Sequence, residues 1–237
     1  MPTDANNIQK LITSKKDKKK AERTKRFFKT GPGEYAEHDP FLGVPNPILR
    51  KIIKENKDIP LEEIAKLLQN RWHEIRLCAL LFFVEKFKHS KLLEQKKIVE
   101  YYIHGAPNYI NNWDLVDLSA PGIIGQYDLT QNNWNQIQYF AARPSLWEKR
   151  IAIVATLAFI RQGHYDPTLK LTLDFMNHPH DLIHKACGWM LREVGKRNQS
   201  QLTDFLQQHK SKMPRTMLRY AIEHYPENTR RKFLQKD

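Results

Sequence analysis

Apolar residues recur at three- and four-residue spacing along most of the chain. Residues 73–87, 146–163 and 180–197 each open with a polar turn and continue in this pattern, and residues 214–226 repeat it in a shorter form. Such spacing places apolar side chains on one face of an α-helix. Patterns typical of β-strands are nearly absent, so the sequence predicts an all-α fold.

The helix starts recur at a regular interval. Arg76, Trp113 and Arg150 follow one another at intervals of 37 residues, each near the start of a helix that follows a polar loop. Lys185 comes 35 residues later, and Arg219 another 34. A period in the mid-thirties, with a helix pair in each period, is typical of HEAT-like repeats that stack into a curved α-solenoid. We therefore expect a HEAT-like repeat α-solenoid.

Two parts are expected along the chain. Residues 1–30 are expected to form a basic N-terminal arm or helix, because "TGPGEY" and the prolines after it interrupt the helical pattern. Residues 31–237 are expected to form a single HEAT-like repeat domain. The segment from Lys15 to Lys29 contains nine basic residues and two acids. This charge run is typical either of a solvated or flexible segment or of auxiliary contacts to phosphates.

The predicted helix from Asp181 to Lys196 has two distinct faces. At about 100° per residue, its apolar positions cluster on one side, which is expected to be buried. The opposite side carries an indole among three cations. Either the indole packs against a neighbouring repeat, or this side contacts a ligand whose phosphates the cations hold. The buried side comprises Ile183, Cys187, Met190 and Val194, and the opposite side comprises Lys185, Trp189, Arg192 and Lys196.

The helix that follows "RPSLW" carries two arginines at the edge of its apolar stripe. Arg150 and Arg161 would commonly extend along the surface to reach water. However, Arg150 shares the repeat position of Trp113 and Lys185, and it is therefore expected on the same concave face. Its planar guanidinium can hold a phosphate with two hydrogen bonds. The stripe expected to be buried consists of Trp147, Ile151, Val154 and Ala158.

The charge of the chain indicates its partners. Lys and Arg total 39 against 26 Asp and Glu, which gives a formal net charge of +13. Such an excess attracts polyanions, and nucleic acid is the commonest of these. An anionic membrane is the other candidate, but the longest apolar run, "IAIVATLAFI", is too short to span a bilayer. The lysine-rich start also lacks the features of a secretory signal. We expect a cytoplasmic monomer that binds double-stranded DNA, with a concave basic groove and no membrane or cofactor.

Cysteine and histidine residues provide little evidence for a redox or metal centre. Cys78 and Cys187 lie on apolar helical faces and are expected to be buried thiols rather than a disulfide. His180 and His184 have the spacing of neighbours on a helix, and His178 lies just before them. Because no third acidic or cysteine ligand is evident, we expect no metal site.

The segment "NNWDLVDLSAPG" places a tryptophan and two aspartates at a helix start. An asparagine before Trp113 is suited to cap the helix, and Asp114 falls in the first turn, where exposed amides favour a carboxylate. Trp113 and Asp117 are four residues apart and share a face. Asp117 lies too far into the helix for a cap. In a basic groove it would either form a structural ion pair with Arg150 or act on a developing positive charge.

Four blocks of the sequence resemble one known family. "NNWDLVDLSAPGIIG", "SLWEKRIAIVATLAFI", "DLIHKACGWMLREVGKR" and "MPRTMLRYAIEHYP" occur in this order and together resemble the AlkD-type DNA alkylation repair proteins. These are HEAT-like-repeat DNA glycosylases, and the resemblance covers residues 25–235. It implies monofunctional N-glycosidic hydrolysis of positively charged alkylated purines in duplex DNA, such as N3-methyladenine and N7-methylguanine. It also implies that the damaged base stays largely stacked in the duplex.

The resemblance also assigns roles to five residues. Asp117, which ends the "WDLVD" motif, would be the catalytic carboxylate, and Trp113 and Trp189 would flank the deoxyribose. Arg150 and Arg192 would hold phosphates. The chemistry is consistent with these roles, because a cationic base leaves without being protonated and the sugar develops oxocarbenium character. A nearby carboxylate stabilises that charge and orients the attacking water, and indole faces favour a cationic group.

The chain departs from the family near its N-terminus. The family often has a basic, aromatic helix leading to a turn of the "FxFxG" type, whereas "GPGEYAEHDPFLGVPNP" keeps Phe41 and Gly43 among acids and prolines. Tyr35 is a further candidate to reach the damaged site. The departure affects the expected substrate range more than the expected reaction. The remaining expected DNA contacts are Lys185, Lys196 and Arg161.

Two other functions fit a chain of helical repeats. A non-catalytic protein could recognise unusual DNA structures through the same groove, because a fold does not fix a function. Such a protein would not need Asp117, Trp113 and Trp189 together. A protein-interaction scaffold would have no affinity for duplex DNA, whereas binding to DNA weakens steeply as salt rises.

Overall fold

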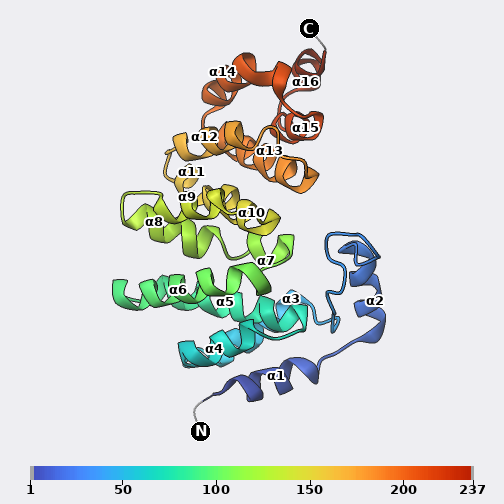
Figure 1. The fold of residues 1–237 in the computed structure, drawn as a ribbon, viewed down its shortest axis with the longest axis vertical. Coiled ribbons are helices and arrows are strands. Elements are labelled where there is room, and N and C mark those ends of the chain that lie inside the picture. The colour runs from blue at the N-terminus through green and yellow to red at the C-terminus, as the bar shows by residue number, and fades with distance from the viewer. Residues whose placement is uncertain (1–2, 236–237) are drawn as a thin grey trace. The chain divides into compact units, whose positions relative to one another are not determined.

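The computed structural model of the chain describes residues 3–235, which are mostly helical and contain no β-strand (Figure 1). Residues 1–2 and 236–237, which belong to the expected arm and repeat domain, lie outside the described residues. The all-α prediction is therefore confirmed for the described part of the chain. Within it, no helix combines the length and the apolar character needed to cross a membrane.

Contacts divide the structure into two compact units, which we call unit 1, ending at Ser119, and unit 2, beginning at Ala120. In unit 1, α5 packs against α3, α4, α6 and α7. Most of α5 is buried, including the charged residues Glu74 and Arg76 near its start. The helices of unit 1 are α1 (Ala5–Thr13), α2 (Lys18–Phe27), α3 (Asn46–Glu55), α4 (Leu61–Leu68), α5 (His73–His89), α6 (Leu92–Tyr109) and α7 (Trp113–Asp117).

The expected N-terminal arm is helical and packs on unit 1. Ile8 and Ile12 of α1 are fully buried, and α1 contacts α3, α4 and α5. Ala21 of α2 and Phe28 just after it are also buried. The basic segment is therefore anchored by apolar side chains and is not a flexible extension. The division of the chain at residue 30 stays a prediction.

In unit 2, α13 packs against α10, α14 and α15. Gly188 permits the close approach of α15, because a Cβ at this position would lie 2.4 Å from the carbonyl oxygen of Met217. The elements of unit 2 are a π-helical turn η1 (Pro121–Gly125), α8 (Gln126–Thr130), α9 (Asn135–Ala142), α10 (Leu146–Ala155), α11 (Leu157–Arg161), α12 (Asp166–Asp174), α13 (Asp181–Gly195), α14 (Gln199–His209), a 3₁₀ turn η2 (Lys210–Lys212), α15 (Arg215–Ala221) and α16 (Glu227–Leu234).

The predicted burial of α13 is confirmed. Its four expected core residues, which include Cys187, have no exposed surface, whereas Lys185, Trp189, Arg192 and Lys196 are half-buried or exposed. Both cysteines are free and buried, and burial raises the pKa of Cys78 and of Cys187 to about 12. The prediction of two buried thiols rather than a disulfide is therefore also confirmed.

The single helix predicted over residues 146–163 is interrupted at Thr156, between α10 and α11. The Thr156 hydroxyl donates a hydrogen bond to the carbonyl oxygen of Ile153 (2.7 Å). The Ala155 carbonyl lies so close to Gly125 of η1 that a Cβ on Gly125 would be 2.1 Å from it. Trp147, in the first turn of α10, is half-buried, so the prediction that it belongs to the buried stripe was wrong. The other three residues of the predicted stripe are buried: Ile151, Val154 and Ala158.

Candidate functional site

Helix α7 carries Trp113 and Asp117, one turn apart. Asn112 caps its N-terminus, accepting a hydrogen bond from the Trp113 backbone N–H (2.9 Å) on its side-chain oxygen. The asparagine cap expected from the sequence is thus confirmed. Trp113 and Asp117 are both half-buried, and both line the same cleft in unit 1.

This cleft has a volume of about 550 Å³ and lies between α2, residues 41–46, the start of α5, and α7. Phe27, Phe28 and Trp113 contribute aromatic walls, and Asp117 contributes a carboxylate. Lys20 and Arg23 of α2 also line the cleft, as does His73 at the start of α5. An aromatic cavity with one accessible carboxylate and nearby cations is suited to a planar or cationic group attached to phosphates.

Aromatic rings from three distant parts of the sequence form the wall of the cleft. The Phe28 ring stacks on Trp113, with centroids 5.0 Å apart and planes at 13°. The Phe41 ring also packs against Phe28, with ring centroids 5.0 Å apart. Tyr35 packs against this same cluster, so the structure brings two predicted site residues, Tyr35 and Trp113, to one group of rings. The sequence pointed to Trp113, Tyr35 and Phe41 one by one, but it did not indicate that Phe28 joins them.

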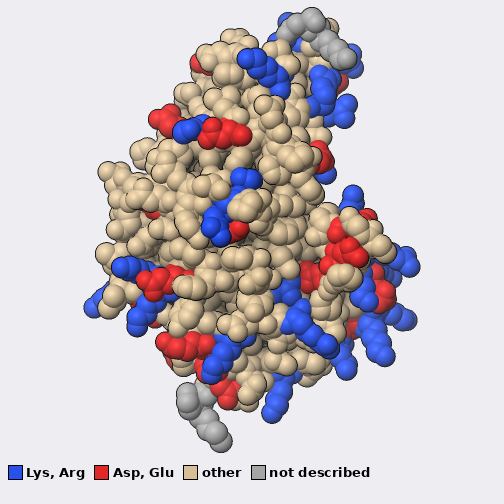
Figure 2. Space-filling view, viewed as in Figure 1, with Lys and Arg blue, Asp and Glu red and all other residues tan. Residues whose placement is uncertain are grey.

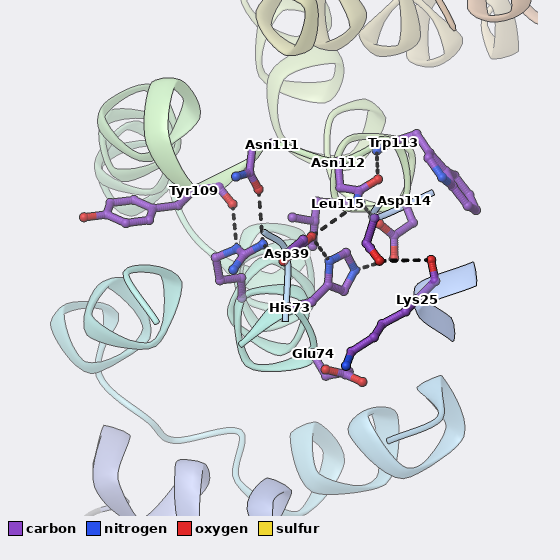
Figure 3. A network of polar contacts seen from close by, with 12 residues as sticks. Lys25, Asp39, His73, Glu74, Tyr109, Asn111, Asn112, Trp113, Asp114 and Leu115 are labelled. Carbon is purple, nitrogen blue, oxygen red and sulfur yellow. Dashed lines mark hydrogen bonds and ion pairs between the residues drawn. The ribbon is translucent and has the colours of Figure 1, made fainter. Parts of the chain in front are cut away.

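A buried polar network lies beneath α7 (Figure 3). The His73 ring contacts Asp39 through Nδ1 (2.7 Å) and Asp114 through Nε2 (2.9 Å). Asp39 also accepts hydrogen bonds from Arg76 Nη2 (2.8 Å) and from Asn112 Nδ2 (3.1 Å). Asp114 therefore has a structural role, but through a buried partner rather than only through the exposed amides of the helix start.

Both ring nitrogens of His73 face carboxylates, which accept hydrogen bonds and cannot donate them when ionised. Burial by itself would lower the pKa of His73, but Asp114 and Asp39 together raise it to about 9. Burial would raise the pKa of Asp39, but His73 and Arg76 hold it below its usual range. Two cations thus balance two carboxylates in the interior of unit 1, and the imidazolium form of His73 is the stable one at neutral pH.

This ionisation makes the stability of unit 1 depend on pH. Because the pKa of His73 is about 9 in the folded state and 6.5 when unperturbed, its contribution is complete below pH 6.5. That contribution falls as pH rises and is lost above about pH 9, and it corresponds to roughly 3 kcal/mol of unfolding free energy. We expect the difference in urea-unfolding free energy between the wild type and His73→Gln to shrink between pH 6 and pH 10. A difference that stays constant over this range would show that His73 is not a buried imidazolium.

Two further side chains hold the cleft in shape. Glu74 accepts hydrogen bonds from the backbone N–H groups of Leu42 (2.8 Å) and Gly43 (2.7 Å), which fixes the loop before α3 onto α5. The Tyr102 hydroxyl is 2.9 Å from Ser119 Oγ, and burial, reinforced by the charge of Asp117, raises the pKa of Tyr102. The phenol therefore stays protonated in the neighbourhood of Asp117. The roles of Glu74 and Tyr102 could not be predicted from the sequence, because their partners lie in other elements.

In unit 2, the predicted DNA contacts on α13 lie on its outer face together with Trp189, which is half-buried. Each of the three cations is paired with a carboxylate. Lys185 Nζ is 3.0 Å from Asp181, Lys196 Nζ is 2.6 Å from Glu193, and Arg192 pairs with Glu223 of the segment after α15. These pairs are partly exposed, so salt and competing phosphates can displace them at little cost.

The two arginines on α10 and α11 differ in exposure. Arg150 is only 5% exposed, and its Nη1 donates a hydrogen bond to the backbone carbonyl of Leu182 (2.7 Å), which ties α10 to the start of α13. Arg161 is exposed at the end of α11. Contact of either arginine with phosphate stays a prediction.

The histidines before α13 have local structural roles. His180 Nδ1 accepts a hydrogen bond from the Leu182 N–H (3.1 Å) and caps α13, while His178 Nδ1 accepts one from the His180 N–H (3.1 Å). Burial and nearby cations lower the pKa of His178 below its usual range. Among residues 3–235, no group of three or more His, Cys, Asp or Glu side chains is arranged to hold a metal ion.

Comparison with known proteins identifies one family and one similar fold. The family model described as DNA alkylation repair enzyme matches residues 8–225. A solved structure described as a predicted DNA alkylation repair enzyme from Enterococcus faecalis is 18% identical in sequence, with a TM-score of 0.69. The match covers 90% of this chain and 98% of that one, and at this identity it shows a shared fold. No curated protein matched the chain.

Proposed function

Because the chain belongs to the DNA alkylation repair enzyme family, we propose that it is a monofunctional DNA glycosylase acting on duplex DNA. Its proposed substrates are alkylated purines that carry a positive charge, such as N3-methyladenine and N7-methylguanine. The observation that carries this proposal is the position of Asp117, a half-buried carboxylate on the wall of an aromatic cleft that Lys20 and Arg23 also line.

In the proposed reaction, the bond between C1′ of the deoxyribose and the purine nitrogen breaks, and its electron pair leaves with the base. The base starts with a positive charge and departs neutral, so it needs no general acid. The Asp117 carboxylate stabilises the oxocarbenium character that develops on the sugar and orients a water molecule toward C1′. The water oxygen bonds to C1′, and its proton passes to Asp117 or to solvent. Trp113 presents an aromatic surface to the same sugar.

The remaining predicted contacts are proposals of the same kind. In unit 2, we assign Trp189 to the damaged nucleotide and Arg150, Arg192 and Lys185 to phosphates. Lys196 and Arg161 are assigned to the phosphates as well, and Tyr35 of unit 1 to the neighbourhood of the damaged site. We propose a monomer that acts in the cytoplasm without a cofactor. The HEAT-like solenoid with a basic groove, and retention of the base in the duplex, stay predictions.

The test of this proposal is the release of free base. Wild-type protein is incubated with duplex DNA methylated by a methylating agent, and free 7-methylguanine and 3-methyladenine are measured by chromatography. We expect release from methylated duplex and none from the same duplex without treatment. Binding that weakens steeply with salt, without any release, would favour a non-catalytic DNA-binding protein. Absence of duplex binding would favour a protein-interaction scaffold.

A further inference from the structure

A groove runs along unit 1 between α3 and the second half of α5, and we call it the α3–α5 groove. It consists of two adjoining cavities, of about 270 Å³ and about 400 Å³, which share Ile53, Lys57 and Glu85. None of its lining residues lines the cleft that contains Asp117, so it is a separate feature of unit 1. The apolar residues that line it are Ile53, Leu81, Phe82 and Val84.

Apolar surface is available at this groove. Three of its four apolar residues are almost completely buried and form its floor, whereas Val84 is half-buried. Ser90 and Glu94 line the larger cavity, and the chain between them, where α6 begins, exposes Leu92 (54%) and Leu93 (73%). Leu93 is the most exposed of the large apolar side chains in the described part of the chain. Single exposed apolar residues are common, but two adjacent ones at the end of a groove indicate an interaction site.

The charge along the α3–α5 groove is predominantly positive. Five Lys or Arg side chains line it against two Glu, and one of these acids, Glu85, pairs with Lys88 and His89 of its own helix. On the face of the molecule shown in Figure 2, by contrast, Asp and Glu side chains lie beside many of the cations of unit 1. The groove cations that form no ion pair with a described carboxylate are Arg50, Lys54, Lys57 and Lys86.

From these observations we propose that the α3–α5 groove docks an acidic, amphipathic helix of a partner protein. Apolar side chains on one face of such a helix, spaced by three and four residues, fill the two cavities and cover Leu93. Carboxylates on its flanks pair with the groove cations that have no acidic partner within unit 1, which sets the orientation of the helix and speeds its association.

Two other polyanions would meet the same cations but would fit the groove less well. The phosphates of DNA would leave the half-buried Val84 and the two exposed leucines in contact with water. An anionic membrane has a surface too flat to fill two cavities, and its charge would face Glu85 and Glu94. An acidic helix is the one occupant that matches both the apolar surface and the charge.

The probe is a fluorescent synthetic helix with leucines at i, i+3, i+4 and i+7 and glutamates on the flanks of this stripe. A peptide of the same composition in scrambled order, without the stripe, is its control. We expect fluorescence anisotropy to show saturable binding of the striped peptide and much weaker binding of the scrambled one. Leu93→Ser should weaken binding of the striped peptide by about tenfold or more, the loss of one apolar anchor. Because Leu93 is exposed, this substitution leaves the core of unit 1 unchanged.

Val84→Lys separates docking from attraction by charge alone. The substitution adds a cation but places a longer, polar side chain in the groove. Docking predicts weaker binding of the striped peptide, whereas attraction by charge alone predicts tighter binding. The double variant Lys54→Glu with Lys57→Glu should also weaken binding by about tenfold or more. Lys15→Glu with Lys16→Glu, which changes the charge equally at exposed positions outside the groove, should have a much smaller effect.

Other results would overturn the docking proposal. Equal binding of the striped and scrambled peptides, or of the striped peptide by the wild type and Leu93→Ser, would show that no helix is seated in the groove. If Lys54→Glu with Lys57→Glu lowers the affinity for undamaged duplex DNA and leaves peptide binding unchanged, the groove belongs to a DNA interface. If Leu93→Ser loses binding to vesicles of anionic phospholipid but keeps peptide binding, the partner is a membrane. Base release by Leu93→Ser should equal that of the wild type, so the docking and glycosylase proposals fail or hold separately.

Discussion

Replacing Asp117 with asparagine is expected to reduce base release from methylated duplex DNA by about 10²- to 10⁴-fold, the range of a missing acid–base group. The substitution keeps the shape of the side chain and removes the negative charge that would stabilise the sugar and orient water. Binding of the variant to a duplex with a tetrahydrofuran abasic site should remain close to that of the wild type, because the amide repels phosphates less than the carboxylate does. Single-turnover base release and duplex affinity, measured on the same preparation, check both expectations.

Asp58→Asn is the matched control, because Asp58 is an exposed aspartate of the same unit and does not line the cleft. It should release bases at the wild-type rate. Two other carboxylates line the cleft, but both are buried and accept hydrogen bonds: Asp114 from His73 and from the Leu115 N–H, and Glu74 from the backbone N–H groups of Leu42 and Gly43. Unchanged turnover in Asp117→Asn would mean that another group carries the reaction, even if the fold and the DNA affinity are intact.

The spacing of apolar residues correctly predicted which face of a helix is buried wherever that face is purely apolar. On α13, every third or fourth residue is apolar, and the predicted stripe, for example Ile183 and Met190, is buried as expected. Helix α5 does not follow this rule, because charged residues on several of its faces are buried as well. His73 and Arg76 are stabilised there by Asp39, which lies 34 and 37 residues away in the sequence. A pattern within one helix carries no information about such a partner.

The candidate site, too, could be predicted from the sequence only in part. Residues within one short motif, Trp113 and Asp117, could be placed on one face from helical spacing, and both line one cleft. The aromatic wall could not be predicted, because Phe28 and Trp113 are brought together by the way α2 folds back onto the unit. The interruption between α10 and α11 at Thr156 could not be predicted either. It lies beside the Ala155 carbonyl, which packs closely against Gly125, and the pattern of residues within one helix contains no information about that contact.

The largest loss of stability is expected from Asp39→Ala. Asp39 is 9% exposed and accepts hydrogen bonds from His73, Arg76 and Asn112. Without this carboxylate, His73 keeps Asp114 as an ionic partner, whereas Arg76 loses its ion pair and keeps hydrogen bonds to uncharged oxygens such as the Tyr109 carbonyl. Removing one member of a buried ion pair costs about 3–5 kcal/mol, because the other charge is left without compensation. This is a large fraction of a typical stability of roughly 5–15 kcal/mol.

Urea unfolding at pH 7, compared with that of Asp58→Ala, measures this loss, and an equal stability of the two variants would contradict the network described for His73. The effect should also reach α7, because Asn112, which caps α7, and His73, which binds Asp114, both contact Asp39. In the fraction of Asp39→Ala that remains folded, we therefore expect base release to fall further than the folded fraction does. His73 and Asn112 then act as positioning residues: they fix the start of the helix that carries Trp113 and Asp117, and Asp39 holds both of them in place.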